Sequence, residues 1–167
     1  MSAAIQTAAS AAINQEPTAT DVPVALEQAR ANATAENLAY AGSVTPSDAW
    51  KLFSEGAVAL VDVRTAEERK FVGHVPNTLH VPWATGTAMT RNPRFTRELE
   101  AKVKKDQAIL FLCRSGKRSA EAAIAATKAG FTQAFNVLEG FEGEIDAQQQ
   151  RGLSDGWRFH KLPWIQD

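Results

Sequence analysis

Residues 108–130 of the chain are AILFLCRSGKRSAEAAIAATKAG. The first five residues are apolar without alternation, which is typical of a strand buried on both faces of a parallel sheet. After Cys113 and a short basic loop, an Ala-rich run predicts a helix that can lie close to that sheet, and Gly130 is a suitable stop signal for it. A buried strand that leads directly into a helix indicates an α/β fold.

Helix and strand patterns alternate over the rest of the chain from residue 43 onward. In the first helix Thr45 can cap, Pro46 suits the first helical position and Gly56 can end the helix. Other segments are predicted as strands at 57–61, 78–81 and 133–140, and as helices at 92–105, with Asn92 as its cap, and at 141–152. We therefore expect a central parallel sheet of about five strands with helices on both faces.

The composition indicates one globular domain. The chain has 167 residues, of which 44% are hydrophobic, and this is enough for one well-buried core. We divide it into an Ala-rich N-terminal extension at 1–40, partly disordered or helical, and a domain at 41–167. The extension lacks the basic start and apolar block of a secretion signal, although 24–40 has the pattern of a helix.

Charge and hydropathy argue against two classes of partner. The 18 Lys and Arg residues are balanced by 19 Asp and Glu residues, for a formal net charge of −1. This balance leaves no broad basic field, so nucleic acid is not an expected partner. No stretch has the length and apolar character of a membrane span, so a membrane is not expected either.

Cys113 is the only cysteine, and its position favours a chemical role. A single cysteine excludes an internal disulfide and a thiolate zinc cage. It also favours a reducing compartment, which we expect to be the cytoplasm. Cys113 lies between the end of a probable central strand and the start of a helix, where α/β sheets usually form their ligand sites.

The loop CRSGKRS, residues 113–119, combines features that stabilise a negative charge. Gly116 allows the backbone to turn successive N–H groups inward, and the start of the following helix adds a positive field. Arg114, Lys117 and Arg118 add formal charge. Together these features favour the thiolate over the thiol. A lone cysteine after a buried strand is often only a small core residue, but three neighbouring cations argue against that interpretation.

Three motifs taken together resemble the rhodanese family of single-domain sulfurtransferases. They are VDVRTAEE at 61–68, GHVPNTLHVP at 73–82 and CRSGKRSA at 113–120. The closing stretches LEGFEGE and GWRFHKLPW are also typical of bacterial members. In two places the chain departs from the family pattern. Asn77 replaces the usual Gly, and the stretch between Arg64 and Gly73 is longer by about one residue.

The resemblance implies a rhodanese-like α/β fold and a sulfur-transfer reaction. Thiolate Cys113 would take sulfane sulfur from thiosulfate or a similar small anionic donor and hold it as a persulfide. A thiol, a cyanide-like acceptor or an acceptor protein would then remove it, and no cofactor is implied. The expected donor-binding residues are Arg114, Ser115, Gly116, Lys117 and Arg118. Asp62 and Arg64 are expected to give structural support, and Arg64 has the helical spacing to pair with Glu68.

Two other functions stay open. Cysteine phosphatases of related fold have one residue more between Cys and Arg than the four that separate Cys113 from Arg118. The shorter loop forms a smaller ring of donors than a phosphoryl group requires. A non-catalytic rhodanese binding module usually lacks the cysteine or the basic loop residues, and this chain has both. No metal is expected, because His80 and His160 lack partners at ligand spacing and His74, in the GHVP segment, is expected to order its loop.

Overall fold

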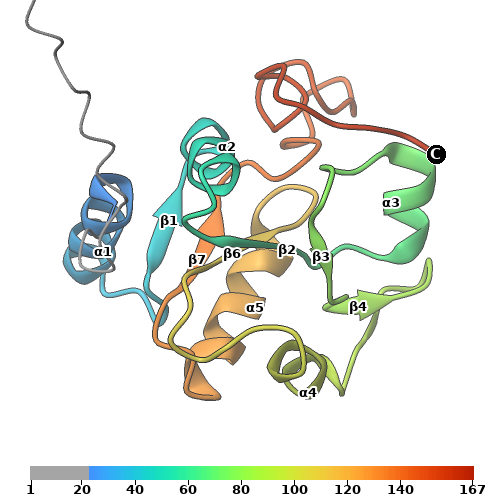
Figure 1. Ribbon diagram of the computed structural model, residues 1–167. Coiled ribbons are helices and arrows are strands. Elements are labelled where there is room, and N and C mark those ends of the chain that lie inside the picture. Colours follow the sequence, from blue (N-terminus) through green and yellow to red (C-terminus); the bar gives the residue numbers. More distant parts are fainter. Residues whose placement is uncertain (1–22) are drawn as a thin grey trace, which may run out of the picture.

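The computed structural model describes residues 23–167 and shows an α/β fold built on a five-stranded parallel sheet (Figure 1). Its strands are β1 (Gly42–Val44), β2 (Ala59–Asp62), β3 (Leu79–His80), β6 (Ile109–Leu112) and β7 (Ala134–Val137). Their order across the sheet is β1-β7-β6-β2-β3, so β6 is the central strand. The predicted fold class and the central place of the strand before Cys113 are therefore confirmed.

Apolar side chains cover both faces of this sheet. Along β6, Leu110 belongs to one buried cluster and Phe111 to the other. Neighbouring strands are in register, with Val61 of β2 opposite Phe111. Because adjacent residues of a strand point to opposite faces, a strand that is buried on both sides is apolar throughout. This explains the unbroken apolar runs in the sequence.

Helices pack on both faces of the sheet. They are α1 (Val24–Glu36), α2 (Pro46–Ser54), α3 (Ala66–Val72), α4 (Phe95–Glu100) and α5 (Lys117–Lys128). α1 and α2 contribute to the cluster that contains Leu110, whereas α4 and α5 contribute to the cluster that contains Phe111 (Figure 1). α3 connects β2 to the edge strand β3. Within residues 23–167 no helix has the length and apolar character needed to cross a membrane.

Side-chain caps mark the beginning of two helices. Thr45 precedes α2, and its Oγ1 accepts a hydrogen bond from the N–H of Asp48 at 3.2 Å. Thr65 precedes α3 and forms a reciprocal capping box with Glu68. Each such cap satisfies backbone N–H groups that have no partner within the helix. α3 is therefore held firmly at the end that faces the loop after β6.

The connection between β3 and α4 is a short hairpin. It contains β4 (Ala84–Thr85) and β5 (Thr90–Arg91), which pair in antiparallel fashion. The prediction of Asn92 as a helix cap is wrong, because α4 begins only at Phe95. The Asn92 side chain instead donates to the carbonyl of Pro82 at 2.9 Å and accepts from the N–H of Arg94 at 3.0 Å. It thereby joins the two ends of the connection.

The predicted helix at 141–152 is also wrong, since this stretch is irregular in the structure. Gly143 has a φ of +86°, outside the helical region, and a side chain there would overlap Asp155. Asp146 Oδ1 accepts hydrogen bonds from the N–H groups of Gln148 and Gln150, both at 2.9 Å. The polar residues that looked like an exposed helix face therefore stabilise a turn.

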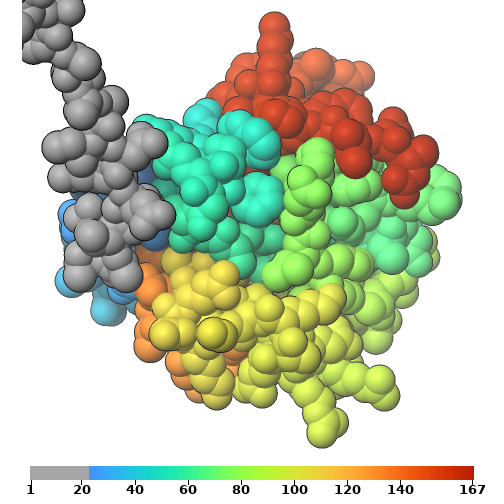
Figure 2. Space-filling view, in the orientation of Figure 1, coloured from blue at the N-terminus to red at the C-terminus, as the bar shows by residue number. Residues whose placement is uncertain are grey.

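The C-terminal segment lies against two earlier parts of the chain. Trp157 is fully buried and packs edge-on against Trp50 of α2. Ile165 forms an isolated antiparallel bridge with His74, in the turn after α3. Figure 2 accordingly shows the red C-terminal surface in contact with the teal and green surfaces of these parts. The C-terminal segment is thus an integral part of the domain.

α1 comes from the predicted extension and packs against β1. Its buried residues are Leu26, Ala29 and Ala33, which form one stripe along the helix. Small residues at two of these positions allow the helix to approach the sheet closely, and the backbone of Ala29 lies directly beside Gly42. Residues 1–22, for which partial disorder was expected, lie outside the described part of the chain.

We predict that Leu26→Ala lowers the free energy of unfolding by about 3 kcal/mol, because it leaves a cavity under α1. Leu26 is 1% exposed. The matched control is Val24→Ala on the same helix, where the side chain is 80% exposed and little should change. Urea unfolding curves measure both effects. Equal, small effects of the two substitutions would contradict the packing of α1 on the domain.

Candidate active site

Cys113 directly follows β6, at the carboxyl edge of the sheet. The residue is 1% exposed and belongs to the buried cluster under α5. Its Sγ accepts a hydrogen bond from the N–H of Gly116 at 3.1 Å and lies 3.1 Å from Oγ of Ser119. The sulfur therefore lies at the floor of the loop that leads into α5.

Backbone hydrogen bonds hold this loop from the outside. The carbonyl of Cys113 accepts from the N–H of Phe141 at 2.7 Å. The carbonyl of Arg114 accepts from the N–H groups of Glu142 at 3.0 Å and Gly143 at 3.1 Å. In a trans peptide the N–H points opposite to the carbonyl. The N–H groups of Arg114 and Ser115 therefore point away from residues 141–143. This is the orientation that an anion-binding loop requires.

Two glycines permit this arrangement. Gly140 has a φ of +67°, and a Cβ at this position would overlap the backbone carbonyl of Arg114. Gly116 has a φ of +98° and is the residue before the first turn of α5. Both conformations are costly for residues with a side chain. The predicted role of Gly116 in turning the loop agrees with this geometry. The absence of a side chain at Gly140 lets the backbone of Arg114 pack directly against it.

Arg118 forms a two-point ion pair with Glu68 of α3. Nη1 and Nη2 of Arg118 each donate to one carboxylate oxygen of Glu68 at 2.8 Å. Burial favours the neutral acid, but the hydrogen bonds from Arg118 and from the N–H of Thr65 outweigh it and lower the pKa of Glu68 from 4.5 to about 2. Burial likewise opposes the charge of Arg118, yet Glu68 raises its pKa. Glu68 thus largely compensates the charge at the end of the loop.

The other two cations of the loop are arranged differently. Lys117 has an 80% exposed side chain, and its Nζ lies 3.9 Å from a carboxylate oxygen of Glu144. Arg114 is half-buried, and its Nε has no hydrogen-bond partner within the described residues. The sequence interpretation assigned all three cations to the donor. In the structure Glu68 holds the guanidinium of Arg118 at the end of the loop. The contact of these cations with a donor stays a prediction.

Asp62 and Arg64 form a fully buried ion pair at the end of β2. Arg64 Nη2 lies 2.9 Å from Oδ2 of Asp62 and also donates to the carbonyl of Gly73 at 2.8 Å. Burial opposes the carboxylate of Asp62, but Arg64 and Arg69 lower its pKa. The expected pairing of Arg64 with Glu68 is wrong, because Glu68 points to Arg118. The structural position of Asp62 and Arg64 is consistent with the supporting role expected for them.

The histidines occupy structural positions. His80 Nε2 lies 2.7 Å from the carbonyl of Arg64, and His74 Nδ1 lies 3.4 Å from the carbonyl of Arg69. His160 pairs with Glu139 at 2.9 Å. Among residues 23–167 no group of three His, Cys, Asp or Glu side chains could hold a metal ion.

Three residues that contact the active-site loop were not identified as site residues from the sequence. Glu68 is part of a quoted motif, but only the structure brings it to Arg118. Ser119 is the last residue of the loop and is fully buried next to the sulfur. Asn136 lies on β7, and its amide contacts both Ser119 and the carbonyl of Gly116. A lone Asn inside an otherwise apolar strand was the one signal that pointed to Asn136.

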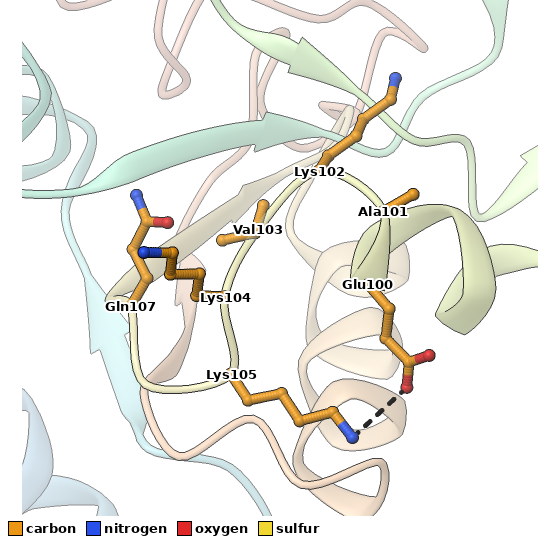
Figure 3. A pocket seen from close by; sticks show the side chains of 7 residues that line it. All are labelled: Glu100, Ala101, Lys102, Val103, Lys104, Lys105 and Gln107. Atoms are coloured by element: carbon orange, nitrogen blue, oxygen red, sulfur yellow. Dashed lines mark ion pairs between the residues drawn. The ribbon is translucent and has the colours of Figure 1, made fainter.

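A surface pocket of about 610 Å³ lies elsewhere, in the turn between α4 and β6 (Figure 3). It is lined by Glu100, Ala101, Lys102, Val103, Lys104, Lys105 and Gln107. An ion pair between Lys105 and Glu100, 3.5 Å long, crosses it. This pocket precedes β6 whereas Cys113 follows β6, so the two lie at opposite ends of the strand and the pocket is separate from the site.

Comparison with known proteins gives consistent matches. The family model of the rhodanese-like domain matches residues 45–145. The crystal structure of Rv0390 from M. tuberculosis is 44% identical with a TM-score of 0.70, and the match covers 77% of this chain and 99% of that one. Senescence-associated protein DIN1 of Raphanus sativus is 31% identical over 126 residues, 72% of this chain and 68% of the relative.

A third match is thiosulfate sulfurtransferase 16, chloroplastic, of Arabidopsis thaliana, which is 31% identical over 83 residues, 48% of this chain and 68% of the relative. The fold and the site define a parallel α/β protein with a cysteine in the loop after its central strand. The chain belongs to the rhodanese-like domain family, because the family model covers more than half of it.

We predict that Gly140→Ala strongly destabilises the active-site loop, because the new methyl group overlaps the backbone of Arg114. Gly86→Ala is the control, since Gly86 has a similar φ of +69° but open space around it. The control should cost about 1 kcal/mol, for backbone conformation alone. Gly140→Ala should cost clearly more and should speed alkylation of the buried Cys113. Similar thermal stability of the two variants would contradict the close packing of Gly140 against the active-site loop.

The Glu68–Arg118 pair predicts a specific dependence of stability on pH. A carboxylate with a lowered folded-state pKa stabilises the protein above its unfolded pKa of 4.5, and that contribution is lost as pH falls toward about 2. The free energy of unfolding of wild type should therefore exceed that of Glu68→Gln at neutral pH, and this difference should be smaller at roughly pH 3. Urea unfolding at both pH values measures the difference. The control is Glu67→Gln, because Glu67 is exposed on the same helix turn. A difference between wild type and Glu68→Gln that is the same at both pH values would refute the stabilising role of the Glu68 carboxylate.

Proposed function

We propose that the protein is a sulfurtransferase that carries sulfane sulfur on Cys113 as a persulfide. One observation carries the proposal: in a chain of the rhodanese-like family, the sulfur of Cys113 lies at the floor of a loop and accepts the N–H of Gly116. A persulfide sulfur added to Cys113 would extend toward the remaining N–H groups of the loop. These groups are suited to stabilise its negative charge.

The reaction has two sulfur-transfer steps. In the first, the thiolate of Cys113 attacks the outer sulfur of thiosulfate. A new S–S bond forms to Cys113, and the original S–S bond breaks with its electron pair leaving on sulfite. In the second, a thiol or cyanide attacks the outer sulfur of the persulfide, and the electron pair of that S–S bond returns to Cys113. No net redox partner and no cofactor are needed.

The sequence limits how the persulfide is resolved. Because Cys113 is the only cysteine, the sulfur cannot pass to a second thiol of the same chain. The acceptor must therefore be an external thiol, a cyanide-like molecule or an acceptor protein. The same lack of a partner thiol supports a reducing compartment, and we propose the cytoplasm.

Thiosulfate, or a similar small anionic donor, is the proposed substrate. Lys117 is exposed at the rim and can contact an anion. Arg114 is half-buried in the same loop, and its guanidinium adds positive charge there. One relative carries the name thiosulfate sulfurtransferase 16, which supports the choice of donor. The loop holds only four residues between Cys113 and Arg118, and this small ring suits a single sulfur atom better than a phosphoryl group.

Intact-mass analysis after incubation with thiosulfate tests the persulfide directly. We expect the wild-type mass to rise by one sulfur atom and to return to its original value on addition of cyanide, with release of thiocyanate. Cys113→Ser should show no added sulfur, because a hydroxyl at this position is a far weaker nucleophile toward sulfur.

Two controls accompany this experiment. The thermal unfolding midpoint of Cys113→Ser should stay close to that of wild type, so that loss of the adduct is not loss of the fold. A small aryl phosphate tests the phosphatase alternative. Absence of the sulfur adduct in a folded wild-type protein, or rapid hydrolysis of the phosphate, would overturn the proposal.

A further inference from the structure

A chain of three buried side chains leads from the sulfur of Cys113 into the core. Sγ lies 3.1 Å from Oγ of Ser119, and Oγ of Ser119 donates to Oδ1 of Asn136 at 2.5 Å. The amide nitrogen of Asn136 then donates to the carbonyl of Gly116 at 3.2 Å. Ser119 is 0% exposed and Asn136 is 4% exposed. Buried polar groups such as these are held by the hydrogen bonds that they make with one another.

The carbonyl of Gly116 fixes the direction of this chain. A carbonyl can only accept, so the side of the Asn136 amide that faces Gly116 must be the NH₂ group. The oxygen of the amide must then face Ser119. Since this oxygen also can only accept, the single hydroxyl proton of Ser119 is committed to Asn136. Ser119 consequently faces the sulfur with a lone pair.

We propose that Asn136 is a positioning residue that makes Ser119 an acceptor toward Cys113, and so stabilises the protonated thiol relative to the thiolate. The proposal rests on the proposed function in that Cys113 is the nucleophile. A hydroxyl lone pair next to sulfur accepts S–H but repels S⁻. The N–H of Gly116 and the start of α5 stabilise the thiolate, whereas Asn136, through Ser119, stabilises the thiol. Asn136 therefore limits how much reactive thiolate is present at a given pH.

Asn136 has the placement that such a role requires. On β7 it points, like Ala134, to the face of the sheet that α5 covers, where the neighbours Ala122, Ala123 and Ala126 are apolar. An amide in these surroundings would be costly without its two hydrogen bonds. The bonds that it makes are both directed at the active-site loop.

The charged groups around this chain are the same in every variant proposed below. From α5 and its loop they are Arg114, Lys117, Arg118 and Glu121, from α3 Glu68, from the end of β2 Asp62 and Arg64, and from the segment after β7 Glu142 and Glu144. β6 and β7 contribute none. A shift in the behaviour of the thiol can therefore be assigned to Ser119 and Asn136.

The test is the pH dependence of alkylation of Cys113 by iodoacetamide, which needs no sulfur donor. Ser119→Ala removes the acceptor of the S–H group, so the midpoint of the alkylation rate should fall by about one pH unit. If Ser119 instead donates to the thiolate, the same substitution raises the midpoint. A rise, or no shift, would overturn the proposal.

A double-mutant cycle tests the role of Asn136. In Asn136→Leu the hydroxyl of Ser119 loses its acceptor and can donate to the sulfur anion, so the midpoint should fall below that of wild type. Adding Ser119→Ala to this variant should then raise the midpoint, the reverse of its effect in wild type. If Ser119→Ala lowers the midpoint both in wild type and in Asn136→Leu, Asn136 does not determine the direction of the Ser119 hydroxyl.

Folding and function are controlled separately. If Asn136→Leu is poorly folded by circular dichroism, Asn136→Ala takes its place in the cycle, and the Ser119→Ala result in wild type decides the sign by itself. The alkylation midpoints are measured whether or not the protein transfers sulfur. A wild type that forms no persulfide but shows the expected midpoints would refute the proposed function and leave this inference intact.

Discussion

The hydrogen bonds between the loop after β6 and residues 141–143 determine the geometry of the whole site. They turn the carbonyls of Cys113 and Arg114 outward, and the direction of the neighbouring N–H groups follows from the planarity of the peptide. Gly140 makes the contact possible, because the backbones approach more closely than a side chain would allow. The loop that carries Cys113 toward α5 is thereby held against residues 141–143.

Charge at the site is more balanced than the sequence of the loop suggests. Three cations follow Cys113 within five residues, yet Glu68 pairs with Arg118 and Glu144 lies near Lys117. The local field at the sulfur is therefore the difference between several opposed contributions. The direction of a buried hydrogen bond at the sulfur, which the carbonyl of Gly116 fixes through Asn136, is one more such contribution.

Local patterns predicted the sheet, its central strand and the loop around Cys113, because buried strands and helix ends depend on a few neighbouring residues. The predictions failed where the conformation depends on contacts with residues distant in the sequence. The stretch 141–152 looked like a helix, but Gly143 donates to the carbonyl of Arg114 in the loop and Asp146 stabilises a turn. Glu68 follows Arg64 at the spacing of a helical ion pair, but Arg64 lies before the start of α3 and tertiary structure brings Glu68 to Arg118. Asn136 lies next to Ser119 only because α5 packs against β7 in the folded domain.

The strand order has a consequence for synthesis of the chain. β1 pairs with β7, and Val44 and its partner Val137 are roughly ninety residues apart. On the ribosome, α1 and β1 emerge long before the strand that completes their hydrogen bonds. The interior strands can assemble first, since β2 and β6 are closer in sequence. β1 then closes the sheet late, and until that moment one edge of the nascent domain offers an unpaired strand to other chains.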